Sequence, residues 1–238
     1  MDFFDRQWST YRAVVDNDLM QHRALTAALS QAVEAWLAAR PAGAAPARMV
    51  DLGCGDLAVM APLLRRLPLG SYLGVDLSAP VLPLAAAALG PVPYPCQWRA
   101  QDLLAWAEAE PGPEPVDLLH SAFAIHHLSG DDKGRFLRLC RRHLAPQGLF
   151  LWADVFRPPG EDHQAYVARY VRRIRSSWSV LAPEQQQPVI DHLSQFDLPP
   201  DRDAIRRTAE ACGWQWQWLW QGDHQAEALA LLTPVDGR

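Results

Sequence analysis

Between residues 47 and 156 the chain alternates short apolar runs with helix-like segments, and this alternation restricts the fold more than any other feature. The apolar runs predict five strands, at residues 47–52, 71–76, 96–100, 116–123 and 149–156. Strands that alternate with helices form a parallel sheet with helices on both faces, and right-handed crossovers make that sheet doubly wound. The pattern therefore predicts an α/β fold whose ligands bind at the carboxyl ends of the strands.

The segments before and after residues 47–156 do not alternate strands with helices. Apolar residues at helical spacing predict helices within residues 1–40. After the fifth strand, residues 157–200 contain two helix-like segments, 162–178 and 183–196. The first helix of the core itself is expected at 57–67, where Pro68 ends it.

The last part of the chain predicts a helix at 204–212 followed by an antiparallel strand pair. Tryptophan occupies every second position of residues 214–220, and residues 226–232 form the return strand. Because side chains alternate across a strand, all four tryptophans are expected on one face. That face either packs under a helix, which we favour, or forms a surface for a partner protein.

Composition and charge exclude several classes of protein. The 22 basic and 27 acidic residues give a net charge of −5, so no global electrostatic attraction to nucleic acid or to an anionic membrane is expected. No apolar run reaches the roughly 18 residues that a membrane span needs. The N-terminus lacks the order of a signal peptide, and four scattered cysteines indicate reduced thiols. We therefore expect a cytoplasmic protein.

A glycine-rich turn follows the first strand, at Asp51-Leu52-Gly53-Cys54-Gly55. Glycines at a strand-to-helix turn let a ligand approach the backbone and the free N–H groups of the helix. Gly53, Gly55 and Ala58 also fit the dinucleotide pattern, so a dehydrogenase remains an alternative. However, the Asp51 carboxylate would repel a pyrophosphate and suits a ligand that carries ammonium and sulfonium charge. A purely structural turn is the remaining alternative.

Two further carboxylates follow the next two strands. Asp76 ends the second strand, where an acidic side chain can accept hydrogen bonds from both hydroxyls of a ribose. The alternative is a helix-start carboxylate, but Ser78 is expected to cap that helix. Asp102 follows the third strand and can accept from the amine of an adenine, with the N–H of Leu103 facing a ring nitrogen. Asp102 can equally be a helix N-cap, and both roles can hold.

Taken in order, these segments resemble the motifs of the class I S-adenosylmethionine-dependent methyltransferases. The matching segments are Val50-Asp51-Leu52-Gly53-Cys54-Gly55, Gly74-Val75-Asp76, Gln101-Asp102, Asp117-Leu118-Leu119 with Ile125-His126-His127-Leu128, and Leu144-Ala145-Pro146-Gln147-Gly148. The resemblance runs from about residue 48 to residue 156 and concerns the fold and the cofactor rather than the substrate. Leu57 departs from it, because the family usually has a third glycine there.

The resemblance implies a Rossmann-like sheet of seven mostly parallel strands that closes with an antiparallel hairpin. We expect one methyltransferase domain over residues 1–238, composed of an N-terminal helical cap (1–40), a cofactor-binding core (47–156), a helical lid insertion (157–200) and a closing helix and hairpin (201–238). The cofactor-binding residues that it implies are Asp51, Gly53, Cys54, Gly55, Asp76, Leu77, Gln101, Asp102, Leu103 and Ser121.

His126 and His127 are the candidate catalytic residues. By the resemblance, the residues that follow the fourth strand face the sulfonium and the acceptor. If the acceptor is a hydroxyl or a protonated amine, a base with a pKa near neutrality helps, and histidine is the usual choice. Alternatively, one histidine packs or caps the next helix, and positioning alone can suffice when the nucleophile is already ionised.

Substrate choice is expected to depend on the N-terminal helices and on the insertion. The candidate substrate-binding residues are Tyr11, His22, Tyr166 and Tyr170. Tyr166 and Tyr170 share one helical face, which suits a cavity wall or simple packing. Trp152 and Trp178 are further candidates for an apolar acceptor pocket. Arginines between residues 169 and 175 could meet a carboxylate or phosphate of a substrate, but a solvated helix face is the favoured interpretation.

The sequence thus predicts an enzyme that transfers a methyl group from S-adenosylmethionine to O, N or C of a small molecule and yields S-adenosylhomocysteine. The alternatives are a non-catalytic protein-interaction partner with the same fold, an NAD-dependent dehydrogenase, and a different use of the same cofactor. No metal is implied, because the three strand-end aspartates are assigned to the cofactor. We expect no nucleic-acid or membrane partner and a monomer or homodimer.

Overall fold

The computed structural model describes residues 10–235 and is built around a seven-stranded sheet; the part of the predicted N-terminal helices that falls on residues 1–9 lies outside this range. The strand order is β3-β2-β1-β4-β5-β7-β6. The strands are β1 (Ala47–Leu52), β2 (Leu69–Asp76), β3 (Cys96–Ala100), β4 (Val116–Ala122), β5 (Leu144–Val155), β6 (Trp214–Gln221) and β7 (Glu227–Pro234).

The direction of the strands confirms the predicted fold class. Neighbouring strands from β1 to β5 pair in parallel, whereas β7 pairs antiparallel with both β5 and β6. In the sheet, β1 lies between β2 and β4. The strand order therefore runs from β1 through β2 to β3 in one direction and from β4 to β5 in the other. This reversal is the switch point at which doubly wound sheets bind their ligands.

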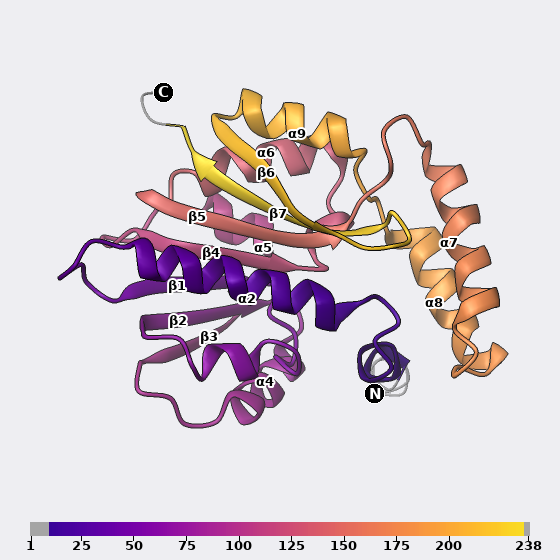
Figure 1. Cartoon of the computed structure of the whole chain (residues 1–238), viewed down its shortest axis with the longest axis horizontal. Coiled ribbons are helices and arrows are strands. Elements are labelled where there is room, and N and C mark those ends of the chain that lie inside the picture. The colour runs from indigo at the N-terminus through magenta and orange to yellow at the C-terminus, as the bar shows by residue number, and fades with distance from the viewer. Residues whose placement is uncertain (1–9, 236–238) are drawn as a thin grey trace.

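Helices cover both faces of the sheet (Figure 1). They are α2 (His22–Ala39), α3 (Ala61–Leu64), α4 (Leu82–Leu89), α5 (Leu103–Glu108), α6 (Gly130–Cys140), α7 (His163–Ser177), α8 (Pro183–Phe196) and α9 (Arg202–Ala211), with single 3-10 turns η1 (Ala79–Val81) and η2 (Ile125–His127). Helices α2, α3 and α4 cover one face, and α5, α6 and α9 cover the other. Helices α7 and α8 form a pair beyond the end of the sheet.

Alternation along the central strands divides the core into two layers. Met49 of β1 and Leu118 of β4 belong to the layer under α2, whereas Val50 and Leu119 belong to the layer under α6. Both layers are apolar because a parallel sheet is buried on both faces. A third cluster joins α7 and α8 to the N-terminal segment, where residues 10–16 are helical and Val14 is buried.

The first helix of the core is much shorter than predicted. Only Ala61–Leu64 is α-helical, and the residues before it form turns. Leu57, at the predicted helix start, has a φ of 57°, in the left-handed region. The apolar spacing correctly indicated which side chains are buried, but it did not indicate the backbone conformation. A residue in the left-handed region cannot continue a right-handed helix.

The four tryptophans of β6 do not share one face, so that prediction is wrong. The pairing of β6 with β7 shifts register between Trp218 and Trp220. Trp214, Trp216 and Trp218 pack in the layer under α6 and α9, whereas Trp220 packs in the layer under α2. A bulge adds one residue to the strand and therefore moves the following side chains to the opposite face.

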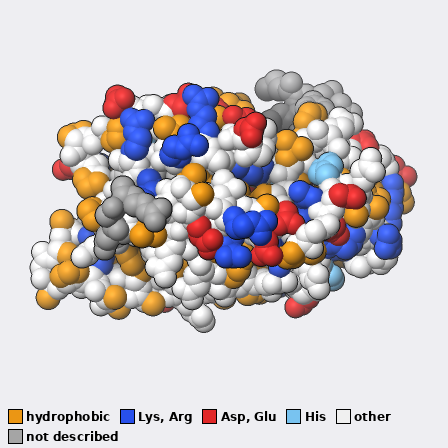
Figure 2. All heavy atoms as spheres, turned by 90° about the horizontal axis from the view of Figure 1, so that it is seen from above, with side chains coloured by type: hydrophobic (Ala, Val, Ile, Leu, Met, Phe, Trp, Pro, Cys, Tyr) orange, Lys and Arg blue, Asp and Glu red, His pale blue; other side chains and the backbone are white. Residues whose placement is uncertain are grey.

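One face of the molecule illustrates how the charged side chains are distributed. On the face that Figure 2 shows, basic and acidic side chains are interspersed rather than gathered by sign. Among the described residues, no helix combines the length and the apolar character that crossing a membrane requires.

A buried lysine connects the end of the sheet to the segment that follows α8. Lys133 in α6 donates from Nζ to the backbone oxygens of His126, Leu128 and Leu198, the last at 2.9 Å. The N–H of Leu198 in turn donates to the backbone oxygen of His126 at 2.9 Å. These bonds hold residues 196–198 against the turn that carries the two histidines.

Replacement of this lysine should therefore destabilise the chain. We expect Lys133→Met to lower the free energy of unfolding by roughly 1–3 kcal/mol, because three buried carbonyl oxygens lose their donor. Unfolding in urea, followed by circular dichroism, measures the change. Arg138→Met, on the exposed side of the same helix, is the matched control and should be nearly neutral. Equal stability of the two variants would contradict the proposed connection.

Candidate active site

The larger of two adjoining cavities lies between the carboxyl end of the sheet and the α7–α8 pair; we call it the histidine cavity. Its volume is about 290 Å³. Its wall contains Thr10, Tyr11, Val14, Met20, His22, Phe123, His126, His127, Val155, Tyr170, Trp178, Pro188, Val189, His192, Leu193 and Asp197. Most of these side chains are apolar or aromatic, and a small number of polar groups converge among them, as is typical of small-molecule sites.

The second cavity lies over the glycine turn; we call it the glycine-loop cavity. Its volume is about 70 Å³, and residues 51–60 form much of its wall together with His120 and Ala122. Tyr11, His22 and Phe123 line both cavities. The two cavities are therefore neighbours, separated by three side chains.

Two glycines give the loop its shape. Gly53 has a φ of 73°, and a Cβ at this position would lie 2.4 Å from the Cβ of Ala124, so no larger residue fits. Gly55 has a φ of 55°, but a Cβ there would meet nothing within 4 Å. The first glycine therefore permits close packing of the β1 and β4 loops, and the second leaves open space beside the backbone.

Asp51 lies at the end of β1 and is 1% exposed. It lines the glycine-loop cavity, but both of its oxygens have protein partners. Tyr72 donates its hydroxyl to Oδ2 at 3.0 Å, and Nδ1 of His120 lies 2.7 Å from Oδ1. Since a carboxylate only accepts, Nδ1 carries the proton. Nε2 of His120 is then buried without a hydrogen-bond partner, in a residue that lines the cavity.

Asp76 organises the loop as well as the strand end. Its Oδ2 accepts the backbone N–H of Gly55 at 2.9 Å, and its Oδ1 accepts that of Ser78 at 2.9 Å. The expectation that Ser78 caps the following helix is wrong, because its side chain makes no capping bond and Asp76 forms the turn instead. Burial, the largest effect, outweighs these bonds and raises the pKa of Asp76.

The remaining predicted cofactor residues lie at the ends of β2, β3 and β4. Asp102 is the N-cap of α5, with Oδ1 accepting from the N–H groups of Leu104 and Ala105. Gln101 and Leu103 flank it and are partly exposed, and Leu77 is 75% exposed beside Asp76. Cys54 lines the glycine-loop cavity.

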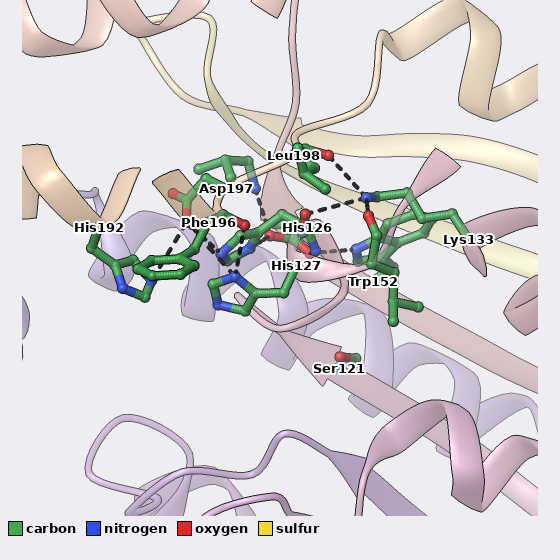
Figure 3. A network of polar contacts seen from close by, with 12 residues as sticks. Ser121, His126, His127, Lys133, Trp152, His192, Phe196, Asp197 and Leu198 are labelled. Atoms are coloured by element: carbon green, nitrogen blue, oxygen red, sulfur yellow. Dashed lines mark hydrogen bonds and ion pairs between the residues drawn. The ribbon is translucent and has the colours of Figure 1, made fainter. Parts of the chain in front are cut away.

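Ser121 does not lie where the prediction requires. Its Oγ donates to the backbone oxygen of Leu52 at 2.8 Å, it is completely buried, and it lines neither cavity. Figure 3 shows it apart from the polar network. Ser121 therefore joins β1 to β4 and is not a cofactor contact, because its side chain points into the sheet.

His126 lies in the turn η2 after β4 and is held from both sides. Its Nδ1 lies 2.5 Å from Oδ1 of Asp154 on β5, and its Nε2 lies 3.4 Å from Oδ1 of Asp197. Asp154 also accepts from the backbone N–H of His126 at 3.1 Å and from Nε1 of Trp152 at 2.9 Å. The orientation of the imidazole is therefore determined by a carboxylate of the neighbouring strand.

The neighbouring His127 is less enclosed, with a side chain that is 41% exposed. Its Nδ1 lies 3.3 Å from the backbone oxygen of Phe196 and 3.8 Å from Oδ1 of Asp197. His192 of α8 approaches the same carboxylate oxygen, with Nε2 at 3.5 Å. Three imidazoles thus surround one aspartate (Figure 3).

The two adjacent histidines have opposite charge preferences. Burial disfavours the charged form of His126, but Asp154 and Asp197 together outweigh it and raise the pKa of His126 to about 10. Burial and the neighbouring His126 charge lower the pKa of His127. Burial also opposes the charge of Asp197, but the contacts with the histidines lower its pKa. The cluster therefore holds positive charge on His126 and negative charge on Asp197.

Three of the four predicted substrate residues line the histidine cavity, namely Tyr11, His22 and Tyr170. Tyr166 does not: it is completely buried against Tyr170, so its shared helical face serves packing. Trp178 lines the cavity as predicted, but Trp152 is buried in the layer under α6, on the other side of β5. The prediction for Trp152 is wrong because alternation along β5 points it away from the cavity.

The arginines of α7 are mostly engaged within the chain. Arg173 lies 2.6 Å from Oε1 of Glu227 on β7, which also accepts from the Tyr170 hydroxyl at 2.7 Å. Arg169 pairs with Glu161 at 2.7 Å. The Arg173 pair attaches α7 to β7, the Arg169 pair joins α7 to the loop before it, and neither arginine lines the histidine cavity.

Sequence reasoning missed four polar residues of the two cavities and their support: His120, Asp154, His192 and Asp197. For His120 and Asp154 a signal existed, because each is a polar residue inside a strand whose neighbours are apolar. No local signal existed for Asp197, which lies about 70 residues from His126 in the sequence.

Comparison with known proteins identifies this arrangement. Residues 50–150 match a family model described as "Methyltransferase domain". A trans-aconitate 2-methyltransferase of Azoarcus sp. (strain BH72) is 39% identical over 103 residues, which are 43% of this chain and 37% of that protein. The match thus spans little more than a third of that relative's length.

Solved structures share the whole architecture. The structure of DhpI in complex with SAH superimposes with a TM-score of 0.55 at 18% identity and covers 98% of both chains. A SAM-dependent methyltransferase of Leishmania major gives a TM-score of 0.59 at 15% identity and covers 93% of this chain and 78% of that chain. At these identities the likeness concerns the fold. The chain is therefore similar to the class I S-adenosylmethionine-dependent methyltransferases, in sequence over residues 50–150 and in fold over most of its length.

S-adenosylmethionine is the cofactor of the methyltransferases that the chain resembles, and the polar groups around the glycine-loop cavity suit its amino-acid end. The buried, unpaired Nε2 of His120 can accept a hydrogen bond from an ammonium group, and the open side of Gly55 leaves the loop backbone approachable. Asp76 ends β2 beside the exposed Leu77, and both lie next to the glycine loop in the fold because Asp76 bonds to Gly55. His120 thus joins the residues that we assign to the amino-acid end.

We expect S-adenosylhomocysteine to raise the melting temperature of the purified chain. At one hundred times the dissociation constant the stabilisation is about 2.7 kcal/mol, which corresponds to a shift of roughly 5–10 °C for a chain of this size. Differential scanning fluorimetry measures it, and NAD at the same concentration should give no shift. A shift with NAD alone would restore the dehydrogenase alternative.

Proposed function

We propose that this chain transfers the methyl group of S-adenosylmethionine to a small molecule that binds in the histidine cavity. The observation that carries the proposal is that the glycine-loop cavity and the histidine cavity adjoin through Tyr11, His22 and Phe123. Methyl transfer needs an acceptor held in line with the reacting carbon in a site that excludes water. Two adjoining cavities, one for the cofactor and one for the acceptor, provide that arrangement.

The wall of the histidine cavity favours a small and largely apolar acceptor. The volume is near the lower end for ligand sites. Trp178, Phe123 and Leu193 supply apolar surface, while the histidines and Asp197 offer polar contacts. None of the described residues that line this cavity is lysine or arginine. We therefore propose an acceptor with one oxygen or nitrogen nucleophile on an aromatic or branched apolar body.

We do not propose the substrate named for the curated relatives, trans-aconitate, as the acceptor of this chain. The histidine cavity takes residues from Thr10 to Asp197, which is a longer stretch than the 103 residues that the curated relative matches. Trans-aconitate carries three carboxylates, whereas the wall contains a carboxylate and no described lysine or arginine. Trans-aconitate is accordingly the reference compound for the assay rather than the proposed acceptor.

Within this proposal His126 and His127 are the candidate catalytic residues, because both line the acceptor cavity. Asp154 and Asp197 orient His126, and the carbonyl of Phe196 contacts His127. The bound cofactor supplies an electrophilic methyl group whose transfer leaves S-adenosylhomocysteine. The chain's residues orient the acceptor and close the site to water: Trp178 and Leu193 form the wall, and Tyr11 covers the boundary between the cavities.

We further propose that residues 157–200 act as the lid within a single domain over residues 1–238. Helices α7 and α8 supply five of the residues that line the cavity, Tyr170, Pro188, Val189, His192 and Leu193, and Trp178 follows directly after α7. A cytoplasmic location agrees with the four free cysteines, and we propose a monomer or homodimer without nucleic-acid or membrane partners.

The experiment that tests the proposal incubates the full chain with isotopically labelled S-adenosylmethionine and a metabolite extract. We expect labelled small molecules to be found by mass spectrometry, with S-adenosylhomocysteine formed in equal amount. Trans-aconitate and a set of simple phenols and amines serve as defined acceptors. Label that appears only on protein or nucleic acid would overturn the small-molecule assignment, and no label in any fraction would overturn methyl transfer.

Replacement of the histidines tests their role. We expect His127→Ala to lower the single-turnover methylation rate at least tenfold, since a lost acid–base or positioning contact costs about 10²–10⁴ in rate. His126→Ala should do the same, because it removes the partner of two carboxylates. His224→Ala, an exposed histidine before β7, is the control and should leave the rate unchanged. If neither cavity variant reaches tenfold, the catalytic assignment is wrong.

A further inference from the structure

The wall of the histidine cavity contains a cluster of metal-ligating side chains that methyl transfer does not require. His126, His127 and Asp197 offer ligand atoms that all lie within 4.8 Å of one another. His192 lies beside them, with Nε2 at 3.5 Å from Oδ1 of Asp197. Figure 3 shows the three imidazoles around the carboxylate. Two imidazoles come from the turn after β4 and one from α8, and the carboxylate comes from the segment after α8.

The spacing within the cluster is wider than that of hydrogen bonds. Oδ1 of Asp197 lies 3.4 Å from His126, 3.8 Å from His127 and 3.5 Å from His192, beyond the usual limit of about 3.2 Å for an N–H···O bond. This oxygen is buried and has no hydrogen-bond partner among the described residues. Two ligands of a tetrahedral metal, each about 2.0–2.1 Å from it, lie about 3.4 Å apart. The separations from Nε2 of His126 and from Nε2 of His192 match that arrangement, whereas the His127 value is measured from Nδ1, the atom that contacts Phe196.

The surroundings of the cluster also resemble the support of a metal ligand. A metal-bound imidazole usually donates its other N–H to a carboxylate or a backbone carbonyl, which fixes the tautomer. Asp154 accepts a hydrogen bond from Nδ1 of His126, so Nε2, on the side of Asp197, is the atom that becomes a ligand when its proton leaves on binding of the ion. Nδ1 of His127 contacts the backbone oxygen of Phe196 in the same manner. Both imidazoles are therefore oriented before any ion arrives.

We propose that His126, His127 and Asp197 bind a divalent transition-metal ion, with His192 as a further ligand. Imidazole-rich sites prefer Zn²⁺ and its neighbours to Mg²⁺ or Ca²⁺, which take oxygen ligands. The sequence analysis implied no metal because it considered only the strand-end aspartates; the carboxylate of this site comes from the segment after α8.

All four side chains line the histidine cavity, so the ion is accessible from it. An acceptor oxygen or nitrogen that enters the cavity can then become an additional ligand. Coordination to such an ion lowers the pKa of a hydroxyl group and fixes its direction. This use of the ion rests on the proposed function, whereas binding of the ion does not.

The test measures metal binding without cofactor or acceptor. The full chain, carrying no histidine tag and stripped with a chelator that is then removed, is titrated with Co²⁺. We expect visible d–d absorption that saturates at one equivalent and is displaced by Zn²⁺. Asp197→Asn and His127→Ala should each weaken Co²⁺ binding at least tenfold. His224→Ala should not change it, because this exposed histidine lies outside the cluster.

Circular dichroism of each variant verifies that it is folded, and the wild-type titration is decisive in itself. Absence of saturable absorption in the wild-type chain would overturn the proposal, as would unchanged binding in both cluster variants. The cluster would then be an ion-pair network that only holds residues 196–198 against the sheet. The metal titration alone tests the metal site. Methylation that persists in the presence of chelator would support the proposed function without the ion, so each proposal can fail while the other stands.

Discussion

The buried carboxylate of Asp154 is the interaction on which the acceptor side of the structure depends. It is completely buried at the end of β5, and it accepts from the imidazole and the backbone of His126, from Trp152 and from its own neighbour Val155. A buried charge that loses its partner costs several kcal/mol, so this set of bonds forms as a unit. It fixes the turn after β4, and the direction of His126 then determines where Asp197 can lie.

The same principle governs the cofactor side. Asp51 joins β1 to β2 through Tyr72 and to β4 through His120, while Asp76 holds the glycine loop and Asp102 starts α5. Each carboxylate therefore serves the fold first. A loop that is already held in place loses less conformational freedom when a ligand binds, which favours affinity. The functional edge of the sheet is organised by acidic side chains that accept from neighbouring strands and loops.

The cover of the site is attached by ion pairs as well as by the third apolar cluster. Arg173 and Glu227 hold α7 to β7, and Arg12 of the N-terminal segment lies 3.1 Å from Asp56 beside the glycine loop. If an acceptor enters the cavity between these elements, part of this cover can move to admit it. Motions of this kind commonly limit turnover in enzymes with covered sites. The Arg12–Asp56 pair is partly exposed and therefore weaker than the buried pair.

The sequence alone determined the sheet. Short apolar runs and turn residues placed the first and third strands at the residues observed and the other core strands within about five residues, because strand formation depends on local pattern. Family resemblance then indicated the cofactor side, since its residues follow strands in order. The sequence could not show the bulge after Trp218, the pairing of His120 with Asp51 or the meeting of His126 with Asp197. Those features depend on register and on contacts between segments far apart in the chain, and only tertiary packing decides them.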